Sequence, residues 1–154
     1  MSDVKPHIMI VESRYYDAIA DEVLAGAIEA IEAAGATYEI HQVAGAYELP
    51  AAVSFAVLQQ EREDRHIYDG YIALGCVIRG ETSHYDYVCG ESARGLMDLS
   101  TGYGLCIGYG VLTVENEAQA WARANRTDKN KGGAVANACL DMIKLKTTFG
   151  LFPR

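Results

Sequence analysis

Three short polar segments of the sequence carry the side chains best suited to chemistry, and each follows a run of apolar residues. They span residues 13–16, 45–50 and 79–84. In the last segment, Gly80, Thr82 and Ser83 stand before a predicted helix, and the first amides of a helix lack partners within it and can bind phosphate. His84 follows at once, and an imidazole both donates and accepts protons near neutral pH. This segment therefore predicts a phosphate site beside a proton-transferring side chain.

Each segment also has a purely structural interpretation, which the sequence leaves open. Tyr15 and Tyr16 would then be half-buried residues at the rim of the fold, and Glu48 a first-turn carboxylate favoured by the helix dipole. The glycines would only form turns, and His84 would be a solvent-exposed residue at a helix start. No single segment decides between the two interpretations.

Basic residues gather late in the chain. Up to Ile78 there are four basic against thirteen acidic residues, whereas from Arg79 onward there are nine against eight, within a total charge of -8. A small anionic ligand is therefore expected to contact the second part. The local cluster there consists of Arg123, Arg126, Lys129 and Lys131. A solvated helix end is the structural alternative for this cluster.

Composition and motifs argue against several classes of function. The acidic balance without a basic stripe is unsuited to nucleic acid, and no apolar run approaches the roughly twenty residues of a membrane helix. The start of the chain resembles neither a secretory signal nor a transit peptide, so a cytoplasmic protein is expected. The four cysteines lack zinc-like spacing, which predicts reduced thiols and no metal site. Walker-type and dinucleotide loops and a nucleophile triad are also missing, so nucleotide cofactors and covalent catalysis are poorly supported.

Apolar periodicity alternates between strand and helix along the chain. Strands are predicted at residues 7–11, 37–43, 70–77 and 105–114. One helix carries Ile19, Val23 and Ile31 on a single face and ends at Gly35. Further helices are predicted at residues 51–60, 85–99, 117–124 and 131–146, with a charged loop at 61–69 and a polar turn at 79–83. This order favours a parallel sheet with helices on both faces, and ligands of such sheets bind beyond the carboxyl ends of the strands. We therefore expect the three polar segments to converge on one cleft.

Longer stretches of the sequence resemble one enzyme family. They are GAYELP (residues 45–50), LGCVIRGETSHYDYVCGESARG (74–95), YGVLTVENEAQAWARA (109–124) and NKGG (130–133), and they are similar to strings of the lumazine synthases. The resemblance runs from the first strand to the last helix, and VIRGETSH followed by YDYV is highly specific. It implies a single domain over residues 1–154 with a three-layer αβα fold of the α/β class: a flavodoxin-like, parallel four-stranded sheet with helices on both faces.

The family's reaction is the penultimate step of riboflavin biosynthesis and uses neither metal nor cofactor. The resemblance implies condensation of 5-amino-6-(D-ribitylamino)uracil with 3,4-dihydroxy-2-butanone 4-phosphate to 6,7-dimethyl-8-ribityllumazine, with release of phosphate and water. His84 matches the family's proton donor and acceptor. Tyr15 matches an aromatic position, more often Phe or Trp, that stacks on the pyrimidine.

By the same resemblance, a further group of residues would hold the pyrimidine and its ribityl chain. They are Ala46, Tyr47 and Glu48 after the second strand, and Cys76, Val77 and Ile78 at the end of the third. Glu48 would accept hydrogen bonds from hydroxyl groups, and the strand end would act through its backbone. Glu81 and Thr82 match the positions that hold the phosphate, through backbone amides and the Thr82 hydroxyl.

The family also implies a homopentamer, either alone or as the unit of a larger assembly. A neighbouring subunit would then supply Tyr109, where Phe is frequent, to close over the ring, Arg123 to pair with the phosphate, and Lys131 nearby. Tyr16 departs from the family, which commonly has Asn there. Two alternatives stay open: a flavin- or lumazine-binding module of flavodoxin-like fold, and a shell-forming structural protein. Neither nucleic acid nor membrane is expected as a partner.

Overall fold

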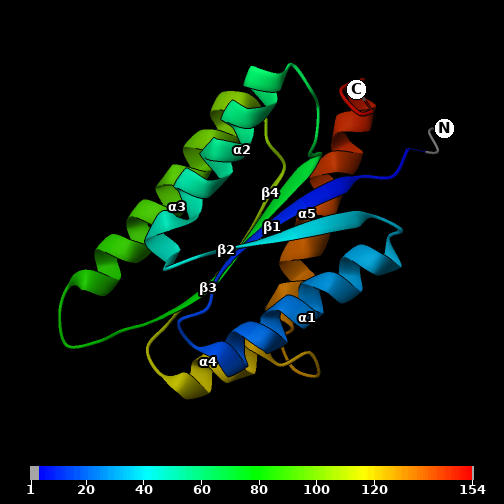
Figure 1. Ribbon diagram of the computed structural model, residues 1–154. Coiled ribbons are helices and arrows are strands. Elements are labelled where there is room, and N and C mark those ends of the chain that lie inside the picture. Colours follow the sequence, from blue (N-terminus) through cyan, green and yellow to red (C-terminus); the bar gives the residue numbers. More distant parts are fainter. Residues whose placement is uncertain (1–3, 154) are drawn as a thin grey trace.

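Four parallel strands form one sheet through the middle of the molecule (Figure 1). The computed structural model describes residues 4–153. Its strands are β1 (His7–Ser13), β2 (Thr37–Val43), β3 (Gly70–Ile78) and β4 (Ile107–Val114), arranged in the order β2-β1-β3-β4. Each neighbouring pair is parallel, and in the last pair Cys76 lies opposite Leu112. The carboxyl ends of these strands therefore meet at one edge of the sheet.

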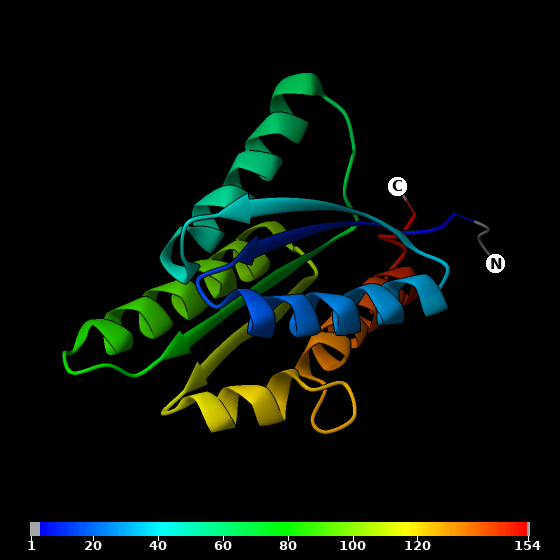
Figure 2. The ribbon, with the colours of Figure 1, turned by 60° about the horizontal axis from the view of Figure 1, so that its bottom comes forward.

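Helices cover both faces of the sheet (Figure 1, Figure 2). On one face lie α2 (Leu49–Glu63) and α3 (His84–Tyr103), and a single 3-10 turn, η1 (Ala46–Glu48), leads into α2. On the other face lie α1 (Asp17–Ala33), α4 (Glu117–Ala124) and α5 (Lys131–Thr148). This arrangement confirms the predicted three-layer α/β class. Across residues 4–153, the structure contains no helix with the length and apolar character that a membrane span requires.

Successive side chains of β3 point to opposite faces of the sheet, and each face has its own hydrophobic core. Ile72 and Leu74 are buried on the face that α1 and α5 cover, whereas Tyr71 and Ala73 are buried with residues of α2 and α3. A parallel strand that is covered on both faces has a near-continuous apolar sequence. The edge strand β2 differs, because most of its residues are exposed.

Two helices, α2 and α3, extend three or more residues beyond their predicted ends. α2 continues to Glu63 and ends at Asp64, whose φ of 46° is left-handed. The prediction of a loop from residue 61 is therefore wrong at its start, because charged residues on an exposed helix face resemble a loop in sequence. α3 extends to Tyr103 and ends at Gly104, which has a φ of 67°. A glycine in this conformation is a common helix terminator, and Gly104 was the signal available in the sequence.

α1 and α5 pack closely because a glycine stands where they cross. A Cβ atom on Gly132 would overlap the carbonyl oxygen of Val23 and lie 3.2 Å from the amide nitrogen of Ala27. Both are backbone groups of α1, so neither moves without bending that helix. Part of the NKGG string therefore has a packing role, which the resemblance alone did not indicate.

Gly132→Ala is expected to lower the free energy of unfolding by about 1–3 kcal/mol, the usual cost of overpacking. Urea unfolding at a fixed protein concentration measures this loss. Gly90→Ala is the matched control, because Gly90 lies within α3 with nothing inside 4 Å of its added Cβ. Alanine there should be neutral or stabilising by up to about 1 kcal/mol. If both variants have the same free energy of unfolding, α1 and α5 pack less closely at their crossing than the structure indicates.

Candidate functional site

The three polar segments named from the sequence lie beyond the carboxyl ends of three adjacent strands. Residues 14–16 follow β1, residues 44–48 follow β2, and residues 79–83 follow β3. Because β1 lies between β2 and β3 in the sheet, the three segments are neighbours along one edge. Open parallel sheets bind ligands at this edge.

The segment after β1 presents one aromatic ring to solvent. The Tyr15 ring is 78% exposed and packs edge-to-face on Tyr16, with 4.9 Å between ring centroids. Arg14 holds the turn that carries both rings, since it donates to Glu12 at 2.8 Å and pairs with Asp17 and Asp21. The ring of Tyr15 is thus held by its neighbours and accessible for stacking on a planar ligand.

Glu12 is a buried carboxylate that sequence reasoning missed. Only 1% of its surface is exposed, and its two oxygens accept from Arg14 at 2.8 Å and from Gln42 at 3.3 Å. A buried carboxylate needs such partners, because its desolvation is costly. The available signal was an acidic residue inside an apolar strand.

The segment after β2 contributes one buried and two exposed side chains. Ala46 is 6% exposed and anchors η1 in the core, whereas Tyr47 and Glu48 point their polar groups to solvent. The Glu48 amide donates to the Gly45 carbonyl at 3.1 Å, which closes the turn. The exposed carboxylate of Glu48 therefore remains able to accept from ligand hydroxyl groups.

The end of β3 supplies a half-buried strand edge. Cys76, Val77 and Ile78 are partly exposed and pair in register with residues 112–114 of β4. Burial raises the pKa of the Cys76 thiol to about 11. The thiol is therefore protonated at neutral pH and is not an activated nucleophile. All four cysteines are free thiols, as predicted.

The turn after β3 is open to solvent over its whole length. Residues 79–84 are all exposed, and His84 is the first residue of α3. The Thr82 hydroxyl accepts from the His84 amide at 3.3 Å, while Ser83 caps the helix without a side-chain hydrogen bond. An exposed helix start with small residues before it suits an anion. The imidazole of His84 forms no hydrogen bond or ion pair within residues 4–153.

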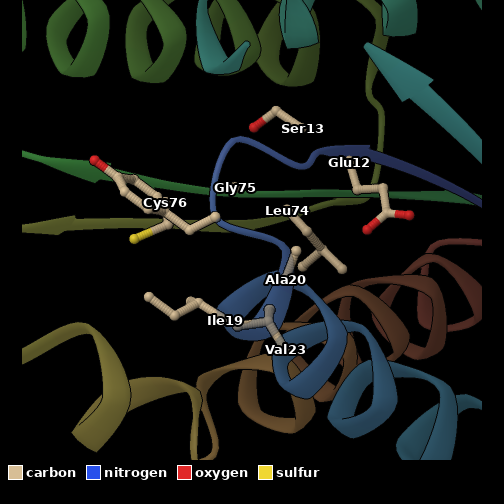
Figure 3. Close-up of a pocket in the computed structure, with 9 residues that line it drawn as sticks. Glu12, Ser13, Ile19, Ala20, Val23, Leu74, Gly75 and Cys76 are labelled. Atoms are coloured by element: carbon tan, nitrogen blue, oxygen red, sulfur yellow. The ribbon is translucent and has the colours of Figure 1, made fainter. Parts of the chain in front are cut away.

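One small, partly open cavity lies beneath this edge of the sheet (Figure 3). It has a volume of about 10 Å³ and lies between the ends of β1 and β3 and the start of α1, with Glu12, Ser13 and Cys76 in its wall. A space of this size holds at most one water molecule. Within the described part of the chain, no three metal-ligating side chains converge. The cavity beside Cys76 is therefore too small to hold a substrate.

The structure does not bring Tyr109, Arg123 and Lys131 to the segments that carry Glu48 and His84. Tyr109 lies opposite Ala73 near the start of β4, half-buried, with its hydroxyl 3.0 Å from Ser92 Oγ, and burial raises its pKa. Arg123 is in α4 and Lys131 starts α5. Both helices cover the face of the sheet opposite to η1 and α3 (Figure 2). Within one chain, the helices that carry these basic groups and the helix that begins at His84 therefore cover opposite faces of the sheet.

The parallel sheet and its two helical layers define a flavodoxin-like α/β protein, a class whose ligands bind at the carboxyl ends of the strands. The family model for 6,7-dimethyl-8-ribityllumazine synthase matches residues 5–147, and the chain belongs to this family. The synthase of Bartonella bacilliformis is 53% identical over 147 residues, covering 96% of this chain and 94% of the relative. The synthase 1 of Rhizobium meliloti is 56% identical over 151 residues, covering 97% and 98%. The synthase of Agrobacterium fabrum is 56% identical over 146 residues, covering 95% and 98%.

Proposed function

We propose that this chain catalyses the condensation of 5-amino-6-(D-ribitylamino)uracil with 3,4-dihydroxy-2-butanone 4-phosphate to 6,7-dimethyl-8-ribityllumazine. Family membership over nearly the whole chain, with relatives above half identity, carries the proposal. The purified protein should release one phosphate for each lumazine formed when both substrates are present. Reactions without one substrate are the controls. A protein that binds flavin yet leaves both substrates unchanged would instead be a binding module.

The substrates would lie along the carboxyl edge of the sheet. The pyrimidine stacks on Tyr15, and its ribityl hydroxyls donate to Glu48 beside Ala46 and Tyr47. The backbone of residues 76–78 borders the ring. The phosphate of the second substrate binds the turn after β3, at the amides of Glu81 and Thr82 and at the Thr82 hydroxyl. The exposure of Tyr15, Glu48 and the turn supports this placement.

His84 would serve several proton transfers in turn. The amine attacks the ketone and forms an imine with loss of water, a proton leaves the adjacent carbon, phosphate departs, and the second amine closes the ring on the remaining carbonyl with loss of a second water. Each step moves a proton, and an imidazole can both take and return one. Ring closure is intramolecular once the imine exists, so holding two substrates in register supplies much of the rate.

A neighbouring chain would complete the site. The helices that carry Arg123 and Lys131 cover the face of the sheet opposite to α3, and a head-to-tail ring would bring both side chains to a neighbour's carboxyl edge. The proposal therefore includes a homopentamer, alone or within a larger shell, and a cytoplasmic location. Tyr109 would border the ring from the same neighbour.

Arg123→Ala is expected to weaken binding of the ketone phosphate by about 1.5–3 kcal/mol, roughly ten- to hundredfold, because a charge-assisted pair is lost. Binding of the pyrimidine should change little. Calorimetric titration with each substrate measures both affinities. Arg126→Ala is the control, because that guanidinium already pairs with Glu22 at 2.8 Å and Glu29 at 2.6 Å. Equal losses for both substrates would show that Arg123 acts through the fold.

A further inference from the structure

Arg79 ties the turn after β3 to two other parts of the molecule. Its amide donates to the Val114 carbonyl at 2.9 Å and so continues the pairing of β3 with β4. Its guanidinium donates to Glu115 at 2.9 Å and to Asp86 at 3.3 Å, and it lies over the Tyr85 ring at 4.2 Å from the centroid. One side chain thus joins the first turn of α3 to the residue that follows β4.

The rest of this turn has few contacts. A Cβ atom built on Gly80 would meet nothing within 4 Å, and the side chains of Glu81 and Ser83 are exposed. The turn's other hydrogen bonds are local, from the His84 amide to Thr82 and from the Asp86 amide to the Ser83 carbonyl. Arg79 is therefore the long-range anchor of a segment that is otherwise held only by its own helix.

The ion pairs of Arg79 are too exposed to add much to global stability. The exposed fractions are 39% for the Arg79 side chain, 61% for Asp86 and 56% for Glu115. Exposed pairs contribute little because water screens them. A planar guanidinium that stacks and bridges two carboxylates does constrain local geometry, because its donors have a fixed direction.

Arg79 also balances charge around the turn. Asp86 belongs to the first turn of α3, and Glu115 directly follows β4 next to the end of β3. Without a cation between them, these two carboxylates would oppose a phosphate at residues 80–83. The guanidinium donates hydrogen bonds to both carboxylates and neutralises their charge. It thereby removes this repulsion, although its own donors do not point to the anion.

We propose that Arg79 is a positioning residue for phosphate: it holds the turn after β3 in its binding shape and neutralises Asp86 and Glu115. This inference rests on the proposed function, because that function places a phosphate at the turn. His84 is the first residue of α3, and Arg79 contacts Asp86 in the first turn of that helix. The contact between Arg79 and Asp86 therefore also positions the imidazole relative to the phosphate-bearing substrate.

Arg79→Met keeps an unbranched, flexible side chain that extends about as far as Nε of arginine, and it removes the guanidinium with its charge and donors. The KM for the ketone phosphate should rise roughly tenfold, as expected when two nearby carboxylates are left uncompensated. The KM for the pyrimidine and the melting temperature should stay close to those of the unmodified protein. Arg94→Met is the matched control, because Arg94 also makes two exposed ion pairs on α3, with Glu91 at 2.6 Å and Asp98 at 2.9 Å. Arg94→Met should leave both KM values unchanged.

Removing the two carboxylates tests how Arg79 acts. Adding Asp86→Asn and Glu115→Gln to Arg79→Met should restore most of the phosphate affinity, because no carboxylate is left to repel the anion. If the triple variant binds phosphate as poorly as the single one, neutralisation of Asp86 and Glu115 is not how Arg79 acts and the inference is wrong. An equal rise in both KM values, or none, would overturn it as well.

Titration with inorganic phosphate separates this inference from the proposed function, because it needs no turnover. The unmodified protein and the triple variant should bind phosphate more tightly than Arg79→Met. If the unmodified protein fails to form lumazine yet shows this order, the proposed reaction fails and the role of Arg79 stands. If lumazine forms but phosphate binding is the same in all variants, the role of Arg79 fails alone.

Discussion

His84→Ala is expected to lower turnover about a hundredfold while leaving the fold intact, at the lower end of the usual range for general acid–base catalysis. The side chain is exposed and forms no hydrogen bond or ion pair with residues 4–153, so its removal costs little stability. The condensation should continue slowly, because the two substrates are still held in register. Affinity for each substrate should change less than turnover.

A pH profile distinguishes loss of a proton carrier from loss of structure. The pH dependence of turnover should differ between the unmodified protein and His84→Ala, because only the unmodified protein has the imidazole that transfers protons. His66→Ala is the control, since His66 lies in the loop before β3, at the opposite end of the sheet, and contacts Asp69 at 2.6 Å. An unchanged rate and profile in His84→Ala would remove His84 from the mechanism.

Two inactive variants should restore activity when they assemble together. One carries Glu48→Ala with His84→Ala, and the other carries Arg123→Ala. At a ketone phosphate concentration far below what Arg123→Ala needs for saturation, each variant alone should be nearly inactive if a site needs all three residues. After joint refolding, roughly a quarter of the neighbouring pairs should combine two undamaged halves, because neighbours in a head-to-tail ring pair at random. Turnover per chain should rise to about that fraction of the unmodified value.

The control is to mix the same variants after each has folded and assembled separately. Without subunit exchange, that mixture should stay inactive. Mass spectrometry of the refolded sample shows whether mixed oligomers have formed. If mixed oligomers form and remain as inactive as their parents, then Glu48, His84 and Arg123 act within one chain, and the assignment of Arg123 to a neighbour is wrong.

Much of the fold was predictable because its signals are local. The spacing of Ile19, Val23 and Ile31 indicates one buried helix face, and all three are buried in α1. The apolar run of residues 70–77 predicts a strand covered on both faces, which is β3. Strands and helices alternate along the chain, which predicts a parallel sheet. Because parallel strands end on the same side, the polar segments that follow them meet at one edge. The sequence alone was therefore enough to place Tyr15, Glu48 and His84 at one edge of the sheet.

Contacts between distant parts of the chain were not predictable in this way. The buried carboxylate of Glu12 and the bridge from Arg79 to Glu115 depend on how neighbouring elements pack. The same holds for Gly132, whose role depends on the place where α5 crosses α1. Apolar periodicity carries information about one element at a time, and none of these contacts lies within one element.

Arg123 and Arg126 show which properties follow from the sequence and which depend on the tertiary structure. The sequence by itself determines that both lie in one basic cluster near a helix end, in a chain whose earlier part is acidic. Only the tertiary structure distinguishes them. Arg126 forms ion pairs with Glu22, 104 residues earlier, and with Glu29, whereas among residues 4–153 Arg123 donates only to the carbonyl of Gln119 in its own helix. An ion pair forms where packing brings two charges within a few ångströms. That distance is decided by α1 and α5 packing together on the sheet, not by the order of residues around either arginine.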